Sequence, residues 1–228
     1  MRDPPKKEVK ESIRLCNRAG IRVVMVTGDQ PVTAKNVGRA VGLTENSEEV
    51  IHSRDIKPYK ELNEDEKTTL LKGSMFARVS PRQKLDLITL HQENRSVVAM
   101  TGDGVNDAPA LKKADIGIAM GLRGTQVAQQ AADMILKDDN FSSIVSAIEG
   151  GRVIFGNIRR FVRYLLSCNI SEIMAVAIAS FAGLPLPLLP LQILFLNLVT
   201  DVFPALALGF DEVDLPSWKD LHEIQMSQ

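Results

Sequence analysis

The sequence has few cysteines and no long block of charge of one sign. Only Cys16 and Cys168 occur in 228 residues, with no CxxC pair and no Cys/His cluster. The sequence therefore supports neither a zinc site nor a disulfide framework, and we expect both thiols to be reduced. The formal net charge is -1, so nothing indicates binding to nucleic acid.

The sequence also lacks internal repeats, low-complexity tracts and a recognisable leader. Its first ten residues are polar and contain two prolines, which is not the pattern of a signal peptide. Charged residues are dense up to about Arg163 and are then almost absent until Asp211. This uneven distribution predicts a charged domain followed by an apolar appendage.

Helical and strand-like segments alternate in the charged part. Apolar spacing, glycine stops and β-branched runs predict helices at about 6–19, 31–41 and from 81 onward, and strands at 21–26, 76–79, 96–100 and 116–120. Strands and helices that alternate in this way are typical of an α/β fold with a parallel, doubly wound sheet.

The most informative segment is the turn 101–109, with the sequence TGDGVNDAP. It follows the apolar run 96–100 and holds two carboxylates, Asp103 and Asp107, four residues apart. Ligands bind at the carboxyl ends of strands in open α/β sheets, and two close carboxylates favour a hard cation such as Mg²⁺. The alternative is a solvated Asp/Asn/Gly turn without a ligand. A similar turn, Thr27-Gly28-Asp29, follows the run 21–26.

A third segment places a lysine near the start of a helix. Ser80 is suited to be the N-cap and Pro81 the first helical residue, so Lys84 falls in the first turn. A cation there opposes the helix dipole, so the position requires an anionic partner nearby. Otherwise Lys84 is an ordinary solvated lysine.

The final third predicts two membrane spans. Residues 164–183 carry one charge, Glu172, and residues 186–210 carry one charge, Asp201. Each stretch is long enough to cross a hydrocarbon core of about 30 Å. Four arginines precede the first span, which places that side in the cytoplasm: Arg152, Arg159, Arg160 and Arg163. A buried helical hairpin in a soluble protein is the alternative.

Five polar residues interrupt these spans, in two groups that each share a helix face. They are Asn169, Glu172, Asn197, Thr200 and Asp201. All offer oxygen donors, which suit a hard cation such as Ca²⁺. Hydrogen bonding between helices would explain Asn and Thr, but it would not explain two carboxylates.

Taken together, these segments resemble the P-type cation-transporting ATPases, specifically the calcium-pump-like branch. The resemblance covers about residues 3–212, and it rests on five motifs in order: Asp3-Pro4-Pro5, MVTGD at 25–29, FARVSP at 76–81, TGDGVNDAPAL at 101–111 and NLVTD at 197–201. It implies a haloacid-dehalogenase-like fold followed by a transmembrane helical hairpin.

The resemblance also implies roles for individual residues in phosphoryl transfer from ATP to an aspartate. Asp103 would bind Mg²⁺, and Asp107 would support that site without direct contact. Thr27, Gly28 and Asn106 would hold the phosphoryl group, and Lys84 would neutralise its charge. Asp29 and Arg78 match positions that contact the nucleotide.

The same resemblance implies an organisation and a cargo. Residues 1–150 would form part of a cytoplasmic phosphorylation domain, 151–212 a stalk and two transmembrane helices, and 213–228 a divergent cytoplasmic tail. The five polar residues of the spans match calcium-site positions, with Mn²⁺ as the alternative cargo. The chain would thus be part of a multi-pass integral membrane protein, whose partners are the lipid membrane, ATP, a divalent cation and the missing remainder of the pump.

One motif of that family is absent. The phosphorylated aspartate lies in Asp-Lys-Thr-Gly-Thr, which does not occur in these 228 residues. We therefore expect the chain to be a piece of a pump that forms no aspartyl-phosphate alone. The competing hypotheses are a catalytically inactive membrane relic or Mg²⁺-binding module, and a soluble phosphatase with a membrane anchor.

Overall fold

The computed structural model describes residues 7–43, 50–185 and 187–209, with the side chains of residues 7, 200, 201, 205, 208 and 209 left out. The Asp3-Pro4-Pro5 motif and the tail 213–228 lie outside the described residues. Within the described part, the chain forms two units that meet between Val145 and Ser146.

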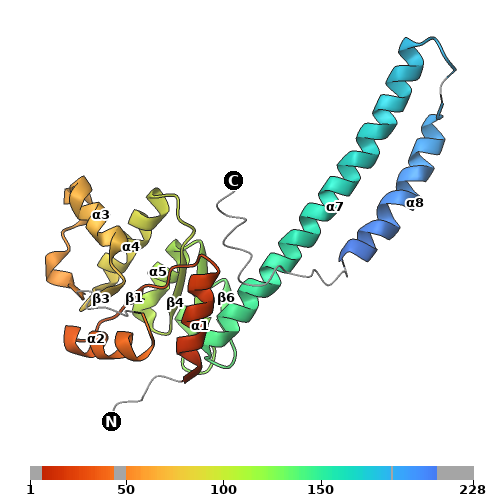
Figure 1. Ribbon diagram of the computed structural model, residues 1–228. Helices are drawn as coiled ribbons and strands as arrows, with labels where there is room; N and C mark the ends of the chain where they lie inside the picture. The colour runs from red at the N-terminus through yellow and green to blue at the C-terminus, as the bar shows by residue number, and fades with distance from the viewer. Residues whose placement is uncertain (1–6, 44–49, 186, 210–228) are drawn as a thin grey trace. The chain divides into compact units, whose positions relative to one another are not determined.

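The first unit contains six short parallel strands and the helices that connect them (Figure 1). The strands are β1 Met25–Val26, β2 Ile51–His52, β3 Met75–Ala77, β4 Ala99–Gly102, β5 Ile116–Met120 and β6 Met134–Leu136. The α-helices are α1 Lys7–Arg18, α2 Pro31–Ala40, α3 Glu64–Lys72, α4 Pro81–Glu93, α5 Ala108–Lys113 and α6 Gln126–Ala131. Short 3₁₀ helices occupy Ser53–Asp55, Tyr59–Glu61 and Val105–Asp107.

All strand pairs are parallel, which confirms the predicted α/β class. The strands pair as two sheets of three, in the orders β1-β3-β2 and β4-β5-β6. Met25 is opposite Met75 in the first sheet, and Ala99 is opposite Ile116 in the second. Within the described ranges, β1 and β4 each pair with one strand, so each has a free edge.

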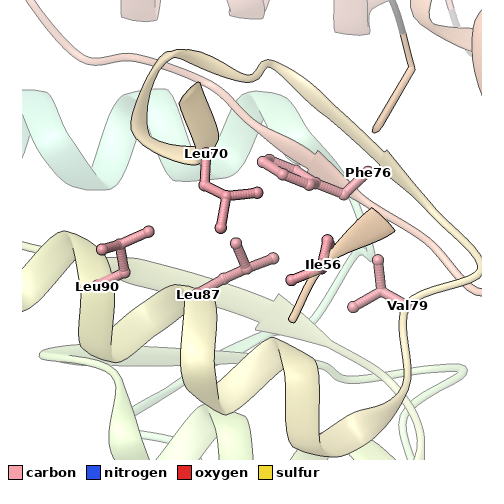
Figure 2. Close-up of a cluster of buried hydrophobic side chains, with 6 residues drawn as sticks. All are labelled: Ile56, Leu70, Phe76, Val79, Leu87 and Leu90. Atoms are coloured by element: carbon pink, nitrogen blue, oxygen red, sulfur yellow. The ribbon is translucent and has the colours of Figure 1, made fainter. Parts of the chain in front are cut away.

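The first sheet and its helices share a core of buried side chains (Figure 2). Phe76 of β3 lies among residues from α3, α4 and the connecting loops, and the cluster consists of Ile56, Leu70, Phe76, Val79, Leu87 and Leu90. A smaller cluster, Leu111, Ala119 and Ala128, joins β5 to α5 and α6. These contacts fix the helices that follow β3, β4 and β5, and with them the loops at the carboxyl ends of those strands.

Two long apolar helices follow. The 41-residue helix α7 covers Phe141–Phe181, and the 20-residue helix α8 covers Pro190–Gly209 with Pro204 inside it. Gly183 adopts a positive φ of 68° in the turn after α7. Among the described residues, α7 is the one helix that is long and apolar enough to cross a membrane, and the apolar stretch Pro190–Pro204 is shorter. The second span therefore stays a prediction.

Candidate functional site

The turn after β1 is held in place by the segment after β3. The backbone N–H of Arg78 donates to the carbonyl of Asp29 at 3.0 Å, and that of Val79 donates to the carbonyl of Thr27, also at 3.0 Å. Within the turn, the Thr27 hydroxyl accepts from the Asp29 N–H at 3.1 Å. Arg78 itself has a positive φ of 59°. Thr27, Asp29 and Arg78 thus belong to one hydrogen-bonded cluster at the carboxyl ends of adjacent strands, and Gly28 lies in the turn between the first two.

Helix α4 begins as the sequence predicted. Ser80 is the N-cap of a capping box, in which its hydroxyl accepts from the Gln83 N–H at 3.3 Å and the Gln83 side chain accepts from the Ser80 N–H at 3.1 Å. The Gln83 amide also donates to the carbonyl of Ser53 at 2.8 Å. This cap sets the first turn of the helix, and Lys84 lies in that turn.

Lys84 finds its anionic partner in Asp107. Their Nζ and Oδ1 atoms are 2.6 Å apart, and the two side chains are only 16% and 13% exposed. The helix dipole required an anion near Lys84, and the resemblance implied the phosphoryl group as that anion; in the structure the Asp107 carboxylate is the partner. The pair connects α4, which follows the first sheet, to the loop that follows β4 in the second sheet.

The loop after β4 folds tightly around Asp107. The Oδ1 atom of Asp107 binds Lys84, and its Oδ2 atom accepts from the Gly104 N–H at 3.2 Å. Both oxygens of this buried carboxylate therefore have a partner. A Cβ atom on Gly102 would lie 2.6 Å from the Cβ of Asp107, closer than packing allows. Glycine at position 102 is therefore required for Asp107 to reach Lys84 and Gly104.

Asp103 and Asn106 differ from Asp107 because both are exposed. Within the part of the chain that is described, neither side chain forms a hydrogen bond or an ion pair, and no three His, Cys, Asp or Glu side chains gather as metal ligands. Mg²⁺ commonly takes one or two carboxylates and completes its shell with water and phosphate oxygens. The free Asp103 carboxylate fits that role, and the engaged Asp107 fits a supporting one.

A third loop contacts the backbone of Asp103, and it was not among the loops that we predicted from the sequence. The backbone N–H of Thr125 donates to the carbonyl of Asp103 at 2.8 Å. Thr125 ends the glycine-containing loop 121–125, which follows β5. The signal was present, because an apolar strand that runs into a Gly-rich polar turn is the same pattern that identified the other two loops.

Two of the five predicted cation ligands come together in the second unit. With its amide nitrogen turned toward α7, Asn197 places that atom 3.0 and 3.2 Å from the two carboxylate oxygens of Glu172. Asn169 instead donates to the carbonyl of Leu165 at 2.8 Å, within its own helix. The side chains of Thr200 and Asp201 lie outside the described residues.

Comparison with known families matches both parts of the chain. Profiles described as haloacid dehalogenase-like hydrolase match residues 1–115 and 85–148. A profile described as the C-terminus of cation transporting ATPases matches residues 185–217.

Curated relatives cover nearly the whole chain. A calcium-transporting ATPase of Bacillus subtilis (strain 168) is 50% identical over 211 residues, which are 92% of this chain and 23% of the relative. An endoplasmic reticulum-type calcium-transporting ATPase 4 of Arabidopsis thaliana is 47% identical over 218 residues, which are 94% of this chain and 20% of the relative. The chain thus spans between a fifth and a quarter of the length of these relatives.

A solved structure gives the same result at the level of the fold. The crystal structure of a zinc-transporting PIB-type ATPase in the E2.Pi state superposes with a TM-score of 0.64 and is 26% identical. The match covers 91% of this chain and 27% of that one.

Proposed function

Since the chain belongs to the haloacid dehalogenase-like hydrolases and, among them, to the P-type cation-transporting ATPases, we propose that it forms the Mg²⁺- and phosphoryl-binding half of an aspartyl-phosphate site and part of a cation site. The whole protein would couple ATP hydrolysis to transport of a cation, with Ca²⁺ as the favoured cargo.

One observation carries this proposal. The buried Lys84–Asp107 pair joins α4 to the short loop that also carries Asp103, whose exposed carboxylate has no partner among the described residues. A lysine held by one carboxylate beside a second, free carboxylate supplies both a positive charge for a phosphoryl group and a ligand for Mg²⁺.

The remaining residues take roles that their positions allow. Asp103 would hold Mg²⁺, while Asp107 keeps Lys84 and the loop in place. Thr27, Gly28 and Asn106 would donate hydrogen bonds to the phosphoryl oxygens, and Asp29 and Arg78 would contact the nucleotide. Bound Mg²⁺ would supply neutralisation of the charge on the phosphoryl oxygens.

The aspartate that accepts the phosphoryl group must come from outside these 228 residues, because no Asp-Lys-Thr-Gly-Thr motif is present. β1 and β4 carry the two TGD turns at their carboxyl ends, and each strand has a free edge among the described residues. An aspartate-bearing strand from the remainder of the pump would find unpaired backbone groups there.

In the second unit, Glu172 and Asn197 would bind the transported cation together with Asn169, Thr200 and Asp201. Glu172 and Asn197 approach each other from two helices, and both would contact one cation if the Asn197 amide turned its oxygen toward that cation. All five residues offer oxygen, which suits Ca²⁺ and also Mn²⁺. By the positive-inside rule, the arginines before residue 164 would lie on the cytoplasmic side together with the first unit, and two spans would make the protein multi-pass.

Binding of Mg²⁺ to the purified chain tests the first half of the proposal. We expect Asp103→Asn to weaken the Mg²⁺ affinity measured by calorimetry at least tenfold, because it removes the one free carboxylate of the loop. Asp65→Asn, an exposed carboxylate in α3, is the matched control and should leave the affinity unchanged. Equal Mg²⁺ affinity of Asp103→Asn and the unaltered chain would refute the assignment.

The absence of the aspartate motif favours one alternative, a binding module that performs no turnover by itself. Incubation of the chain with labelled ATP distinguishes this binding module from half of a working phosphorylation site. We expect no acid-stable phosphoenzyme from the chain alone, and labelling on a supplied polypeptide that contains the Asp-Lys-Thr-Gly-Thr motif. Labelling of the chain itself would contradict the proposal, and no labelling in the mixture would favour the module.

A further inference from the structure

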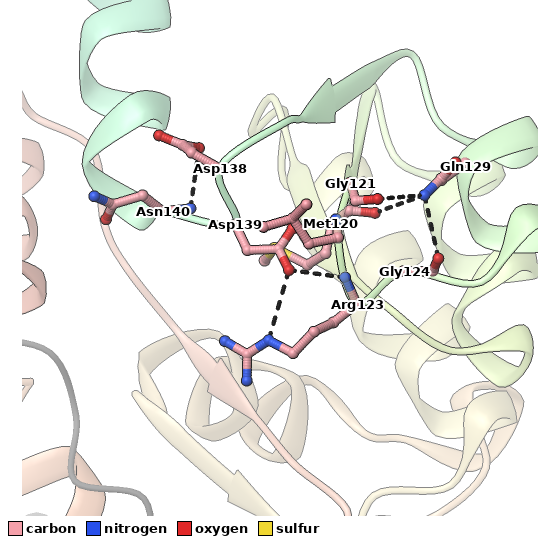
Figure 3. Close-up of polar contacts among 9 residues, drawn as sticks. Met120, Gly121, Arg123, Gly124, Gln129, Asp138, Asp139 and Asn140 are labelled. Atoms are coloured by element: carbon pink, nitrogen blue, oxygen red, sulfur yellow. Dashed lines mark hydrogen bonds and ion pairs between the residues drawn. The ribbon is translucent and has the colours of Figure 1, made fainter.

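The carbonyl groups of the loop 121–125, between β5 and α6, are bound by the side-chain amide of Gln129. The side-chain nitrogen of Gln129 donates to three carbonyls of the loop and its preceding strand (Figure 3): those of Met120, Gly121 and Gly124, at 3.2, 3.0 and 3.1 Å. One side chain thus fixes the carbonyl groups at both ends of the loop.

The N–H groups of the same loop are bound by Asp139. Its Oδ1 accepts from the Leu122 N–H at 3.0 Å, and its Oδ2 accepts from the Arg123 N–H at 2.9 Å. The Arg123 guanidinium lies 3.6 Å from Oδ2, and the Asp139 side chain is only 4% exposed. The hydrogen bond from the Leu122 N–H lowers the pKa of the Asp139 carboxyl below its usual value, and the hydrogen bond from the Arg123 N–H lowers it further. Together these bonds outweigh burial, which raises the pKa.

The held loop contacts the loop that follows β4 and carries Asp103. Thr125 caps α6 by accepting from the Ala128 N–H at 3.3 Å, while its own N–H donates to the Asp103 carbonyl at 2.8 Å. A short path of hydrogen bonds and backbone therefore leads from the Asp139 carboxylate through residues 122–125 to the backbone of Asp103.

Asp139 is itself fixed where the chain enters α7. It adopts a positive φ of 50°, and the next residue, Asn140, accepts from the Ser142 N–H at 3.2 Å in the first turn of the helix. Asp138 accepts from the Ser143 hydroxyl at 2.6 Å. The anchor of the loop is thus a hydrogen-bonded turn at the start of α7.

We propose that Asp139 is a positioning residue for phosphoryl transfer, which holds loop 121–125 so that Thr125 sets the position of Asp103. This role rests on the function proposed above for Asp103. A loop with two glycines loses much conformational entropy when it is fixed in one conformation. An ionised acceptor that binds two N–H groups offsets this entropic cost better than a neutral acceptor.

Three variants test the role. Asp139→Gly removes both acceptors, and Asp139→Asn keeps a neutral acceptor; Gly and Asn both tolerate a positive φ. Asp138→Asn alters the neighbouring carboxylate, whose hydrogen bonds to Asn140 and Ser143 lie in the turn before α7, and it serves as the matched control.

Two measurements on the full chain are compared, amide hydrogen exchange at Thr125 and the Mg²⁺ dissociation constant. In Asp139→Gly, we expect exchange at Thr125 to accelerate about tenfold or more and Mg²⁺ affinity to fall about tenfold, since two charge-assisted hydrogen bonds are lost. Asp139→Asn should show smaller changes of the same sign, and Asp138→Asn should match the unaltered chain in both.

The outcomes separate this inference from the function on which it rests. If the unaltered chain binds no Mg²⁺, the proposed metal site fails, while Thr125 exchange still decides whether Asp139 holds the loop. If Asp139→Gly and Asp139→Asn leave exchange and affinity unchanged, the positioning role is overturned. If Asp139→Gly loses exchange protection throughout the chain, its folding has failed and Asp139→Asn decides instead. Unaltered exchange at Thr125 in Asp139→Asn would then also overturn the positioning role.

Discussion

Lys84 and Asp107 illustrate how a residue pair can serve the fold and the site together. Each side chain is mostly buried, so each charge depends on the other for the solvation that water would have supplied. The same chain contains a second lysine–carboxylate pair on a helix, Lys67–Glu64, in which the Glu64 side chain is 89% exposed. The two pairs differ in burial and also in sequence separation, because Lys84 and Asp107 are 23 residues apart whereas Lys67 and Glu64 are i,i+3 neighbours on one helix.

Removal of the buried lysine should destabilise the first unit. We expect Lys84→Met to lower the free energy of unfolding by about 2 kcal/mol, because it leaves the Asp107 carboxylate buried without its cation. Lys67→Met should cost less than about 1 kcal/mol, as exposed pairs contribute little. Urea unfolding without Mg²⁺ measures both. An equal decrease in the free energy of unfolding of the two variants would show that the contribution of Lys84 to stability does not depend on the burial of Asp107.

His91 should make stability depend on pH. Burial lowers the pKa of His91 below its usual 6.5, and the charge of Arg22 lowers it further. Between the folded pKa and 6.5 the unfolded chain binds more protons, so this contribution to stability is full above about pH 6.5 and is lost as the pH falls through the folded pKa. Urea unfolding from pH 7.5 to 5.5 should show this decline. His91→Gln should flatten it, and an unchanged slope in that variant would assign the decline to other groups.

Single residues also show where sequence reasoning succeeds. The requirement for an anion near Lys84 follows from the helix dipole, and the structure supplies one. Asp139 could not be found in this way, because Asp-Asp-Asn before a helix is equally typical of an ordinary turn or cap. Its importance depends on contact with a loop that lies 16 and 17 residues away in sequence.

At the scale of elements, the helix starts were more predictable than the strand limits. Helix caps are local, whereas a strand ends where its partner ends. The expected strand 21–26 is reduced to Met25–Val26 because its partner β3 has only three residues. The expected strand 96–100 becomes Ala99–Gly102, since the carboxylate of Asp115, rather than a strand partner, binds the Val98 N–H.

Helix α3 was missed although it carries a readable signal. It is polar and only nine residues long, so its apolar periodicity is weak. Its start nevertheless has a capping box, in which Asn63 accepts from the Glu66 N–H at 2.8 Å and Glu66 accepts from the Asn63 N–H at 3.0 Å. The same local motif opens α4, where it was recognised only through Ser80 and Pro81.

The two capping boxes allow a test of whether α4 matters to the site. Ser80→Ala and Asn63→Ala should each lower the free energy of unfolding by about 1 kcal/mol, the usual effect of losing an N-cap. Only Ser80→Ala should also weaken Mg²⁺ binding, because Lys84 of α4 binds Asp107 and so holds the loop that carries Asp103. Chemical unfolding and calorimetry measure the two effects. Equal Mg²⁺ affinity in both variants would show that Lys84 keeps its position without the cap.

At the scale of the whole molecule, the α/β class and the family were predictable from the order of the motifs, but the division into two sheets was not. Sequence periodicity locates strands without saying which strands pair, and the pairing β1-β3-β2 and β4-β5-β6 depends on tertiary contacts. The cation site stays a prediction, made as a set of residues. Of that set, the structure brings together Glu172 and Asn197 and leaves Asn169 bonded within its own helix.

The membrane hairpin gives the largest-scale prediction. If α7 and α8 both span the bilayer, the turn at 183–185 lies on the opposite side from the first unit. In a background of Cys16→Ala and Cys168→Ala, we expect Leu184→Cys to react with a membrane-impermeant maleimide added to sealed cells. Lys112→Cys, on the exposed face of α5, should react only after permeabilisation. Reaction of both cysteines under the same condition would refute the hairpin, because the two positions would then share one side of the membrane.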